Sequence, residues 1–326
     1  AVGLACAILI MLFVQDELTY DEWLEGAEDV YRVDLIFHVP SQPPSPDLAV
    51  IMYPAGERLK ADFPQIVDFA RITQQASAVK FGENGYFETA TVADANLFQV
   101  LQFPLVAGDP ATALARPDAV VLNETLARKY FGDADPMGQT LLLDGKHSAV
   151  VTAVMKDLPH NTQFDIALII STNSEANRND IAQAEQQWFS TNWYTYLKLQ
   201  PGADADALRA AMPDFLDRHV LGVEQAFQGL KPHDGLSLYL HNLLDIHLYA
   251  RAQAEMAPAG DIVIVYGVMA IAALILMIAC INFMNLATAR ATQRAREVSL
   301  RKVVGARRSQ IMAQFLSEST LIAPLG

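Results

Sequence analysis

The chain has 326 residues, a formal net charge of −14 and an apolar fraction of 52%. Its mean hydropathy of +0.18 is too high for one ordinary water-soluble domain, which points to membrane-spanning segments. The acidic balance argues against nucleic-acid binding, because a nucleic-acid-binding protein needs a basic surface.

Residues 1–14 (AVGLACAILIMLFV) form the first uncharged, apolar run. One interpretation of so short a run is the core of a secretory signal peptide. No small-residue cleavage site follows it, because the chain continues as QDELTYDEW. We therefore interpret residues 1–14 as the outer end of a first transmembrane helix whose beginning is missing, which makes the sequence a fragment.

Residues 15–261 form a long middle segment in which strand and helix patterns are mixed. Alternating apolar residues over 31–37 and 193–200 predict strands, and residues 54–63 predict a helix. Local signals predict Asn123 and Asp204 as helix N-caps, Gly132 as a helix stop, and a tight primed hairpin turn at Asp144-Gly145. Residues 155–190 carry no clear pattern. The mixture predicts an α+β extracytoplasmic domain in two lobes, inserted between transmembrane α-helices.

The middle segment offers few candidates for catalysis or for metal and cofactor binding. No nucleotide-binding loop, H-E-x-x-H or G-x-S-x-G motif occurs, and Gly145-Lys146 fits a hairpin turn. If HNLLDIHLY (241–249) is a strand, His241, Asp245 and His247 share one face. A metal pair is then conceivable, although ordinary polar side chains are the favoured interpretation. We expect no catalytic residue, no cofactor and no metal, and a protein that is not itself an enzyme.

An aromatic cluster is the other distinctive feature of the middle segment. Its members are Trp188, Phe189, Trp193, Tyr194 and Tyr196. Packing in the core or between lobes is the favoured interpretation, and a ligand or partner surface is the alternative. The two cysteines, Cys6 and Cys280, lie in apolar runs, so the middle segment must be held together by its core and not by disulfides.

From Ile262 to Ala289 the chain has no charged residue, and Asp261 and Arg290 bracket this run. A helix of about 20 apolar residues is long enough to cross a hydrocarbon core of ~30 Å. We expect residues 262–289 to form the second transmembrane helix.

Residues 290–315 are expected to form a basic helical segment. Residues 290–308 hold seven Lys or Arg and one acid, Glu297, whereas residues 1–289 carry 16 basic and 35 acidic side chains. By the positive-inside rule the basic end is cytoplasmic, and the acidic middle segment lies outside. Glu297 and Arg301 are spaced as a helix-supporting pair, and Gly305 is expected to divide the segment into two helices. Contact with anionic lipid is an alternative role for these charges.

Residues 316–326 turn apolar again. We expect them to begin a third transmembrane helix that the sequence does not complete.

The segment INFMNLATARATQRAREVSLRKVVGARRSQIMAQFLSEST resembles the region after a membrane helix in FtsX-like permeases, the membrane subunits of MacB-type ABC transporters. The residues that carry the resemblance are Asn282, Asn285, Arg294, Glu297, Arg301, Lys302, Gly305, Ala306, Glu318 and Ser319. The N-terminal stretch through VYRVD similarly resembles the family's first helix and the entry to its MacB-like periplasmic core domain. Residues 104–114 (PLVAGDP…AL) and 120–141 (VVLNETLARKYFG…ADPMGQTL) resemble recurring pieces of that domain.

The resemblance implies a multi-pass permease subunit of the bacterial inner membrane, with one helix before a large periplasmic domain and three after it. Two permease copies, in a homodimer or heterodimer, are expected to be driven by a cytoplasmic ABC ATPase on a partner chain, for efflux or for force transmission in the envelope. A periplasmic partner protein and membrane lipid are the other expected contacts. The candidate ATPase-coupling residues are Arg294, Glu297, Val298, Leu300, Arg301, Lys302, Gly305, Ala306, Arg307 and Arg308.

Two other functional classes, a sensor and an enzyme, are alternatives to the permease. An extracytoplasmic sensor or chemoreceptor also places two membrane helices around an outer domain, but it should continue into a long cytoplasmic coiled helix. The chain instead turns apolar again by residue 316. A hydrolase or metal enzyme in the outer domain lacks a candidate site. The sequence leaves four alternatives open for the task of the permease. It could transport a lipoprotein, a peptide or an antibiotic, or it could only transmit force to an envelope partner.

Overall fold

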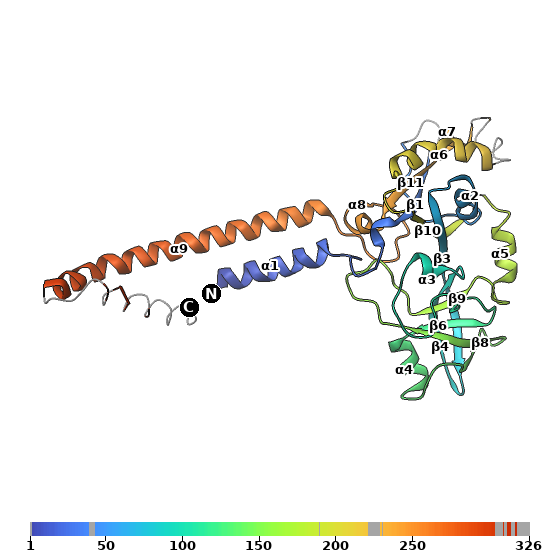
Figure 1. Ribbon diagram of the computed structural model, residues 1–326, viewed down its shortest axis with the longest axis horizontal. Coiled ribbons are helices and arrows are strands. Elements are labelled where there is room, and N and C mark those ends of the chain that lie inside the picture. Colours follow the sequence, from blue (N-terminus) through green and yellow to red (C-terminus); the bar gives the residue numbers. More distant parts are fainter. Residues whose placement is uncertain are drawn as a thin grey trace. The chain divides into compact units, whose positions relative to one another are not determined.

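The computed structural model describes residues 2–38, 43–188, 190–220 and 231–303, together with positions 229, 309, 312, 313 and 317. Two compact units are distinguished (Figure 1). The helical unit comprises Ala1–Leu18 and Ile262–Gly326, and the outer domain comprises Thr19–Asp261.

The helical unit contains α1 (Val2–Leu18) and α9 (Ile262–Val303), which run antiparallel side by side (Figure 1). The helices approach closely at small residues, since a Cβ added to Gly3 would lie 3.2 Å from the Cβ of Ala279. Small residues at such a contact allow backbones to approach in a membrane, where packing drives helix association. Large apolar side chains are exposed along both helices, which suits a lipid surrounding.

The described part of the outer domain is built on an eleven-stranded sheet. Its main path runs β11 (Leu236–Asn242), β1 (Val30–Phe37), β10 (Thr191–Leu199), β3 (Ile66–Phe81), β4 (Asn84–Ala93), β9 (Leu168–Ser171), β6 (Ala119–Asn123), β8 (His147–Met155) and β5 (Leu105–Ala107). Off this path, β2 (Ile51–Met52) pairs with β10, and β7 (Thr140–Leu143) pairs with β3 and β8. The β4–β9 and β6–β8 pairs are parallel, and the other pairs are antiparallel.

The longest strand, β3, belongs to both halves of this sheet. Residues 66–72 pair with β10, and residues 72–81 pair with β4. The β3–β4 hairpin therefore extends from the half that contains β1 into the half that contains β6 and β8.

Short helices cover the sheet. They are η1 (Ala27–Asp29), α2 (Ala55–Asp62), α3 (Leu97–Val100), α4 (Glu124–Phe131), α5 (Arg178–Ala184), α6 (Ala205–His219), α7 (Pro232–Gly235), η2 (Leu243–Asp245) and α8 (Ile246–Tyr249). Apolar residues of α2 and α6 pack with β1, β10 and β11 into one hydrophobic cluster, and those of α4 pack with β6, β8 and β9 into another. A third cluster around Phe98, Phe103, Phe164 and Tyr196 includes residues from both halves. The α+β class predicted from the sequence is confirmed.

Local sequence signals are confirmed at the predicted residues. The side chain of Asn123 accepts a hydrogen bond from the amide of Leu126 at 2.8 Å, and Asp204 accepts two from the first turn of α6. Asp144 and Gly145 have φ angles of 51° and 69°, as a primed hairpin turn between β7 and β8 requires. The patternless region 155–190 contributes β9 and α5.

Candidate functional site

Helix α9 is the element that links the outer domain to the candidate coupling residues. Its 42 residues begin directly after Asp261. Within the described residues, its part Ile262–Arg290 is the one helix long and apolar enough to cross a membrane, with a mean hydropathy of 2.9. At 1.5 Å per residue the whole helix is about 63 Å long, roughly twice a hydrocarbon core of ~30 Å.

The candidate coupling residues fall partly on α9 and partly beyond the described chain. Arg294, Glu297, Val298, Leu300, Arg301 and Lys302 lie on its continuous helical backbone, so Glu297 and Arg301 are one turn apart. Gly305, Ala306, Arg307 and Arg308 lie outside the described residues, and so does residue range 316–326 apart from position 317. The expected division of the segment at Gly305 stays a prediction.

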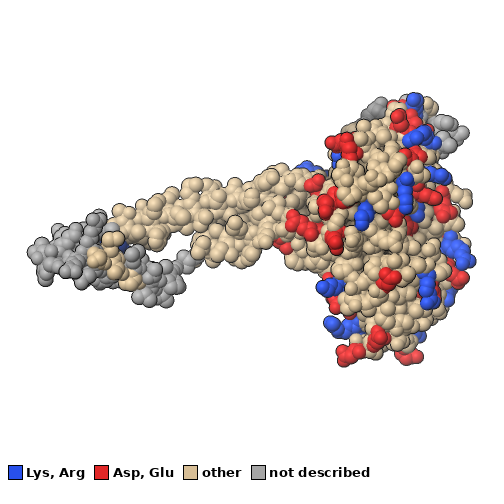
Figure 2. All heavy atoms as spheres, in the orientation of Figure 1, with Lys and Arg blue, Asp and Glu red and all other residues tan. Residues whose placement is uncertain are grey.

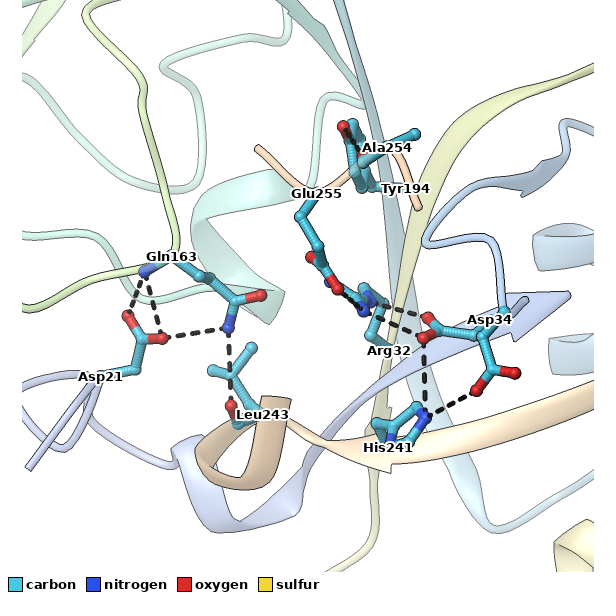
Figure 3. A network of polar contacts seen from close by, with 10 residues as sticks. Asp21, Arg32, Asp34, Gln163, Tyr194, His241, Leu243, Ala254 and Glu255 are labelled. Atoms are coloured by element: carbon cyan, nitrogen blue, oxygen red, sulfur yellow. Dashed lines mark hydrogen bonds and ion pairs between the residues drawn. The ribbon is translucent and has the colours of Figure 1, made fainter. Parts of the chain in front are cut away.

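The outer domain joins the two helices through an N-terminal connector (residues 19–29) and a C-terminal connector (residues 250–261). Each connector is fixed to the domain by buried polar contacts, which Figure 3 shows. Helices α1 and α9 continue directly from the connectors.

The C-terminal connector is held by Arg32 of β1, whose side chain is only 1% exposed. Its guanidinium donates to both carboxylate oxygens of Asp34, at 2.7 and 2.9 Å, and to both carboxylate oxygens of Glu255 (Figure 3). Burial disfavours the Arg32 cation, but the two carboxylates outweigh burial and hold its pKa above the ordinary value. The Nε2 atom of His241 lies 3.6 Å from Asp34 and 3.8 Å from Asp47, beside this pair.

The N-terminal connector is held by Asp21, which is also buried. Its carboxylate accepts hydrogen bonds from the backbone and side-chain nitrogens of Gln163 (Figure 3). It also accepts one from the hydroxyl of Thr162. The backbone of Asp21 adds a hydrogen bond to the carbonyl of Asn161 at 3.0 Å. Burial raises the pKa of Asp21, and the hydrogen bonds from Thr162 and Gln163 oppose that rise.

Helix α8 contacts both connectors. The ring of His247 stacks on the ring of Tyr20, and its carbonyl accepts a hydrogen bond from the amide of Gly260 at 2.8 Å. The two ends of the outer domain therefore meet on one short helix.

A cleft of about 580 Å³ lies beside the connectors. Its lining combines Tyr20 and Met256 with residues of the 157–167 loop, including Asp157 and Phe164. The Asp157 carboxylate already accepts hydrogen bonds from the amide and hydroxyl of Thr125. The cleft is thus partly polar and partly apolar, and its polar groups include carboxylates.

The proposed shared face of His241, Asp245 and His247 is wrong. His241 lies in β11, Asp245 ends η2, and His247 belongs to α8, because the chain leaves the strand after Asn242. In the described residues no group of three His, Cys, Asp or Glu side chains is arranged to hold a metal ion.

The predicted aromatic cluster is divided between different environments. Tyr194 and Tyr196 are buried in the central hydrophobic cluster, whereas Trp193 packs edge-on against Tyr53. Trp188 lies against His219, and Phe189 lies outside the described residues. The described members therefore pack within the domain, as the favoured interpretation predicted.

The polar residues of the connectors were missed from the sequence. The alternation over 31–37 that predicts this strand places Arg32 and Asp34 on its polar face, but β1 is covered on both faces. An i,i+2 charge pair inside an otherwise apolar strand is the one local signal that could have indicated a buried ion pair.

Charge on the outer surface is mixed. Figure 2 shows acidic and basic side chains distributed together over the visible face of the outer domain, whereas the described surface of the two helices is uncharged along most of its length. An extended basic surface of the kind that binds nucleic acid is not visible on this face.

Comparison with known proteins identifies two family segments. Residues 1–215 match the MacB-like periplasmic core domain, and residues 269–326 match the FtsX-like permease C-terminal segment. A crystal structure of a permease-protein domain from Porphyromonas gingivalis matches 67% of this chain and 91% of that domain, with a TM-score of 0.56 at 19% identity, which shows a common fold.

Relatives with assigned names are longer than this chain. The macrolide export ATP-binding/permease protein MacB of Neisseria meningitidis is 26% identical over 208 residues, which are 64% of this chain and 28% of that protein. The pyoverdine export ATP-binding/permease protein PvdT of Pseudomonas fluorescens is 25% identical over 277 residues, which are 82% of this chain and 37% of that protein. Since the first family match alone covers more than half of its residues, the chain belongs to the family of the MacB-like periplasmic core domain and continues into an FtsX-like permease segment.

Proposed function

We propose that this chain is a permease subunit of an ABC transporter in the bacterial inner membrane. Residues 1–14 and 262–289 cross the membrane, residues 15–261 are periplasmic, residues 290–315 are cytoplasmic, and residues 316–326 enter the membrane again. ATP hydrolysis on a partner chain, acting on a pair of permease subunits, moves the periplasmic domain for efflux or for force transmission in the envelope.

The continuity of α9 carries this proposal. One uninterrupted helix runs from the C-terminal connector through the apolar part to Val303, past most of the basic residues. A helix is stiff along its axis because every interior turn is hydrogen-bonded to the next. Displacement of its basic end therefore reaches the outer domain without a flexible joint inside the membrane.

The composition of the basic end supports a contact with a motor protein. The positive-inside rule favours a cytoplasmic location for its Lys and Arg residues. The sequence has no nucleotide-binding loop of its own, so hydrolysis requires another polypeptide segment. The relatives MacB and PvdT are both named as ATP-binding/permease proteins, which is consistent with such a motor.

Reversing the charge of Glu297 tests the proposal. The chain is reconstituted in nanodiscs with the ABC ATPase encoded beside its gene, and ATPase rates are measured with and without the permease. We expect Glu297→Lys to reduce the permease-dependent change in ATPase rate by up to about tenfold, because mutations between coupled sites alter the coupling free energy by about 0.5–2 kcal/mol. Membrane insertion should be unchanged, and Gly305→Pro should act in the same direction.

Gln293→Lys is the matched control, since it adds a cation to the same helix without removing the Glu297 carboxylate. It should leave the ATPase response unchanged. An equal loss in both variants would indicate a general effect of charge on lipid contact. An ATPase rate that never responds to the wild-type chain would contradict the permease proposal and favour the sensor class.

A further inference from the structure

The contacts of the C-terminal connector are concentrated on β1 and its immediate neighbours. Glu255 binds Arg32 of β1, and the hydroxyl of Tyr194 on β10 donates to the carbonyl of Ala254 (Figure 3). Gln253 exchanges backbone hydrogen bonds with Asp47 and Ala49, at 2.6 and 3.0 Å. These three consecutive residues therefore lie against the half of the sheet that contains β1 and β10.

The backbone at this point is held in an unfavourable conformation. Ala254 has a φ angle of 61°, in the left-handed region that residues other than glycine rarely adopt. Such a conformation persists only where surrounding contacts enforce it. The contacts of the neighbouring Gln253 and Glu255 supply that enforcement.

The N-terminal connector is fixed to a different part of the domain. Asp21 binds Thr162 and Gln163, which belong to the loop between β8 and β9. Those two strands lie in the opposite half of the sheet from β1. The buried side-chain anchor of the N-terminal connector thus lies in the β8–β9 loop, whereas the backbone of this connector continues at Val30 into β1.

We propose that the Arg32–Glu255 ion pair fastens the C-terminal connector to β1, so that movement of α9 is passed to the β1 half of the sheet. The Asp21 contacts likewise fasten the N-terminal connector to the β8–β9 loop, so that movement of α1 is passed to that loop. This inference rests on the proposed function, because it requires α9 to move during the ATPase cycle. Such a pair suits this task, since separating it would leave the largely buried Glu255 carboxylate without its counter-charge, while Arg32 would keep Asp34 as its remaining partner.

The test measures ATP-driven movement of the outer domain in the full chain. The protein, with Cys6 and Cys280 replaced by serine, is reconstituted with its ATPase in nanodiscs. A spin label is attached through a ketone amino acid at position 87, because Phe87 is 85% exposed. The distance between the labels of the paired permease copies is recorded without nucleotide and with ATP and vanadate.

Glu255→Gln keeps the size of the side chain but removes the charge that pairs with Arg32. We expect it to reduce the nucleotide-dependent change in label distance about threefold or more, because the buried pair is broken. The ATPase rate should remain close to that of wild type. The matched control is Arg251→Gln, which removes the exposed Arg251–Asp261 pair within the same connector and should leave the distance change intact.

A disulfide provides a rescue that separates fastening from simple loss of structure. Leu48 forms β-bridges with Leu35 of β1 and with Gln253, so Leu48→Cys and Gln253→Cys would tie the connector to the sheet beside the lost ion pair. Residues paired across a β-bridge are close to the Cα separation of about 4.4–6.8 Å that a disulfide needs. In the Glu255→Gln background, oxidation of this pair should restore the distance change, and reduction should abolish it again.

The outcomes distinguish the two proposals. A wild-type chain without any nucleotide-dependent distance change would overturn both the proposed permease function and the fastening role of the Arg32–Glu255 pair. A normal change in Glu255→Gln would overturn the fastening role alone. A lost change that the oxidised disulfide does not restore would also overturn the fastening role alone.

Discussion

The rings of Tyr20 and His247 stack face to face, with their centroids 3.5 Å apart and their planes 5° from parallel. Tyr20 lies in the N-terminal connector. The backbone carbonyl of His247 accepts a hydrogen bond from the amide of Gly260, which lies in the C-terminal connector. The stack therefore holds the connectors together on α8, although their buried side-chain anchors lie in different places, at the β8–β9 loop and at β1.

Removing the Tyr20 ring should destabilise the outer domain. We expect Tyr20→Ala to lower its free energy of unfolding by about 2 kcal/mol, because both buried area and aromatic stacking are lost. Tyr20→Phe keeps the stack and should retain most of the stability. Urea unfolding followed by fluorescence measures both variants, and equal losses in the two would mean that the stack contributes nothing.

The Arg71–Asp94 pair should be sensitive to the loss of one partner. Arg71 donates to both oxygens of Asp94, at 2.8 and 3.1 Å, and to the carbonyl of Tyr53. Arg71→Met should lower the free energy of unfolding by about 3 kcal/mol or more, because Asp94 would stay buried without its counter-charge. Arg116→Met is the matched control: its partner Asp118 and Arg116 itself are exposed, so the urea midpoint should move far less than in Arg71→Met.

Gly108 should not tolerate a side chain. Its φ angle is 99°, and an added Cβ would lie 2.5 Å from the Cβ of Ala153 and 2.8 Å from the carbonyl of Thr152. Gly108→Ala should therefore cost about 3 kcal/mol or more, from backbone strain and overpacking together.

Gly138 separates these two causes. It has a φ angle of 75°, but an added Cβ would meet no atom within 4 Å. Gly138→Ala should cost only the strain of a left-handed alanine, about 1 kcal/mol. Thermal unfolding of the two variants compares them directly, and equal costs would show that the contact with β8 is unimportant.

The buried carboxylate of Asp21 should give the outer domain a pH-dependent stability. Burial raises its pKa above the ordinary value of 3.8, so the folded state binds more protons than the unfolded state just above that pH. The contribution of Asp21 to stability is therefore lost as the pH rises through this range. Because asparagine does not titrate, the melting temperature of Asp21→Asn relative to wild type should increase between pH 4 and pH 7.

Asp118 offers a control, because its pKa is shifted in the opposite direction from that of Asp21. The hydrogen bond from Arg116 lowers the pKa of Asp118, so its contribution is present at neutral pH and is lost as the pH falls. Asp118→Asn should therefore become less stable relative to wild type as the pH rises. Melting curves that move in the same direction for both variants would contradict the assignment for Asp21.

Features set by neighbouring residues could be predicted from the sequence. The Asn123 cap, the Asp204 cap and the Asp144-Gly145 turn each depend on backbone groups within a few residues. The apolar part of α9 was equally visible, because its length and lack of charge are properties of one continuous segment.

Features set by distant residues could not be predicted in this way. Glu255 pairs with Arg32 across 223 positions, and Asp21 meets Gln163 across 142, so no local pattern marks either contact. Strand β9 could not be predicted for a related reason. Leu168–Ser171 is buried on both faces between β4 and β6, so its sequence shows no alternation of polar and apolar residues. The role of Glu297 and its neighbours in coupling stays a prediction from resemblance.

Because the strand β3 is long and shared by both halves of the sheet, a rigid rotation at one of its ends would produce a larger displacement at the other. Its 16 residues extend about 50 Å at 3.3 Å per residue, and both of its ends are paired into the sheet. A rotation of about 10° at the end beside β10 would therefore sweep the far tip of the β3–β4 hairpin through roughly 9 Å over that length. Small angular changes at the base are thus converted into large linear displacements at the hairpin, without any change in strand pairing.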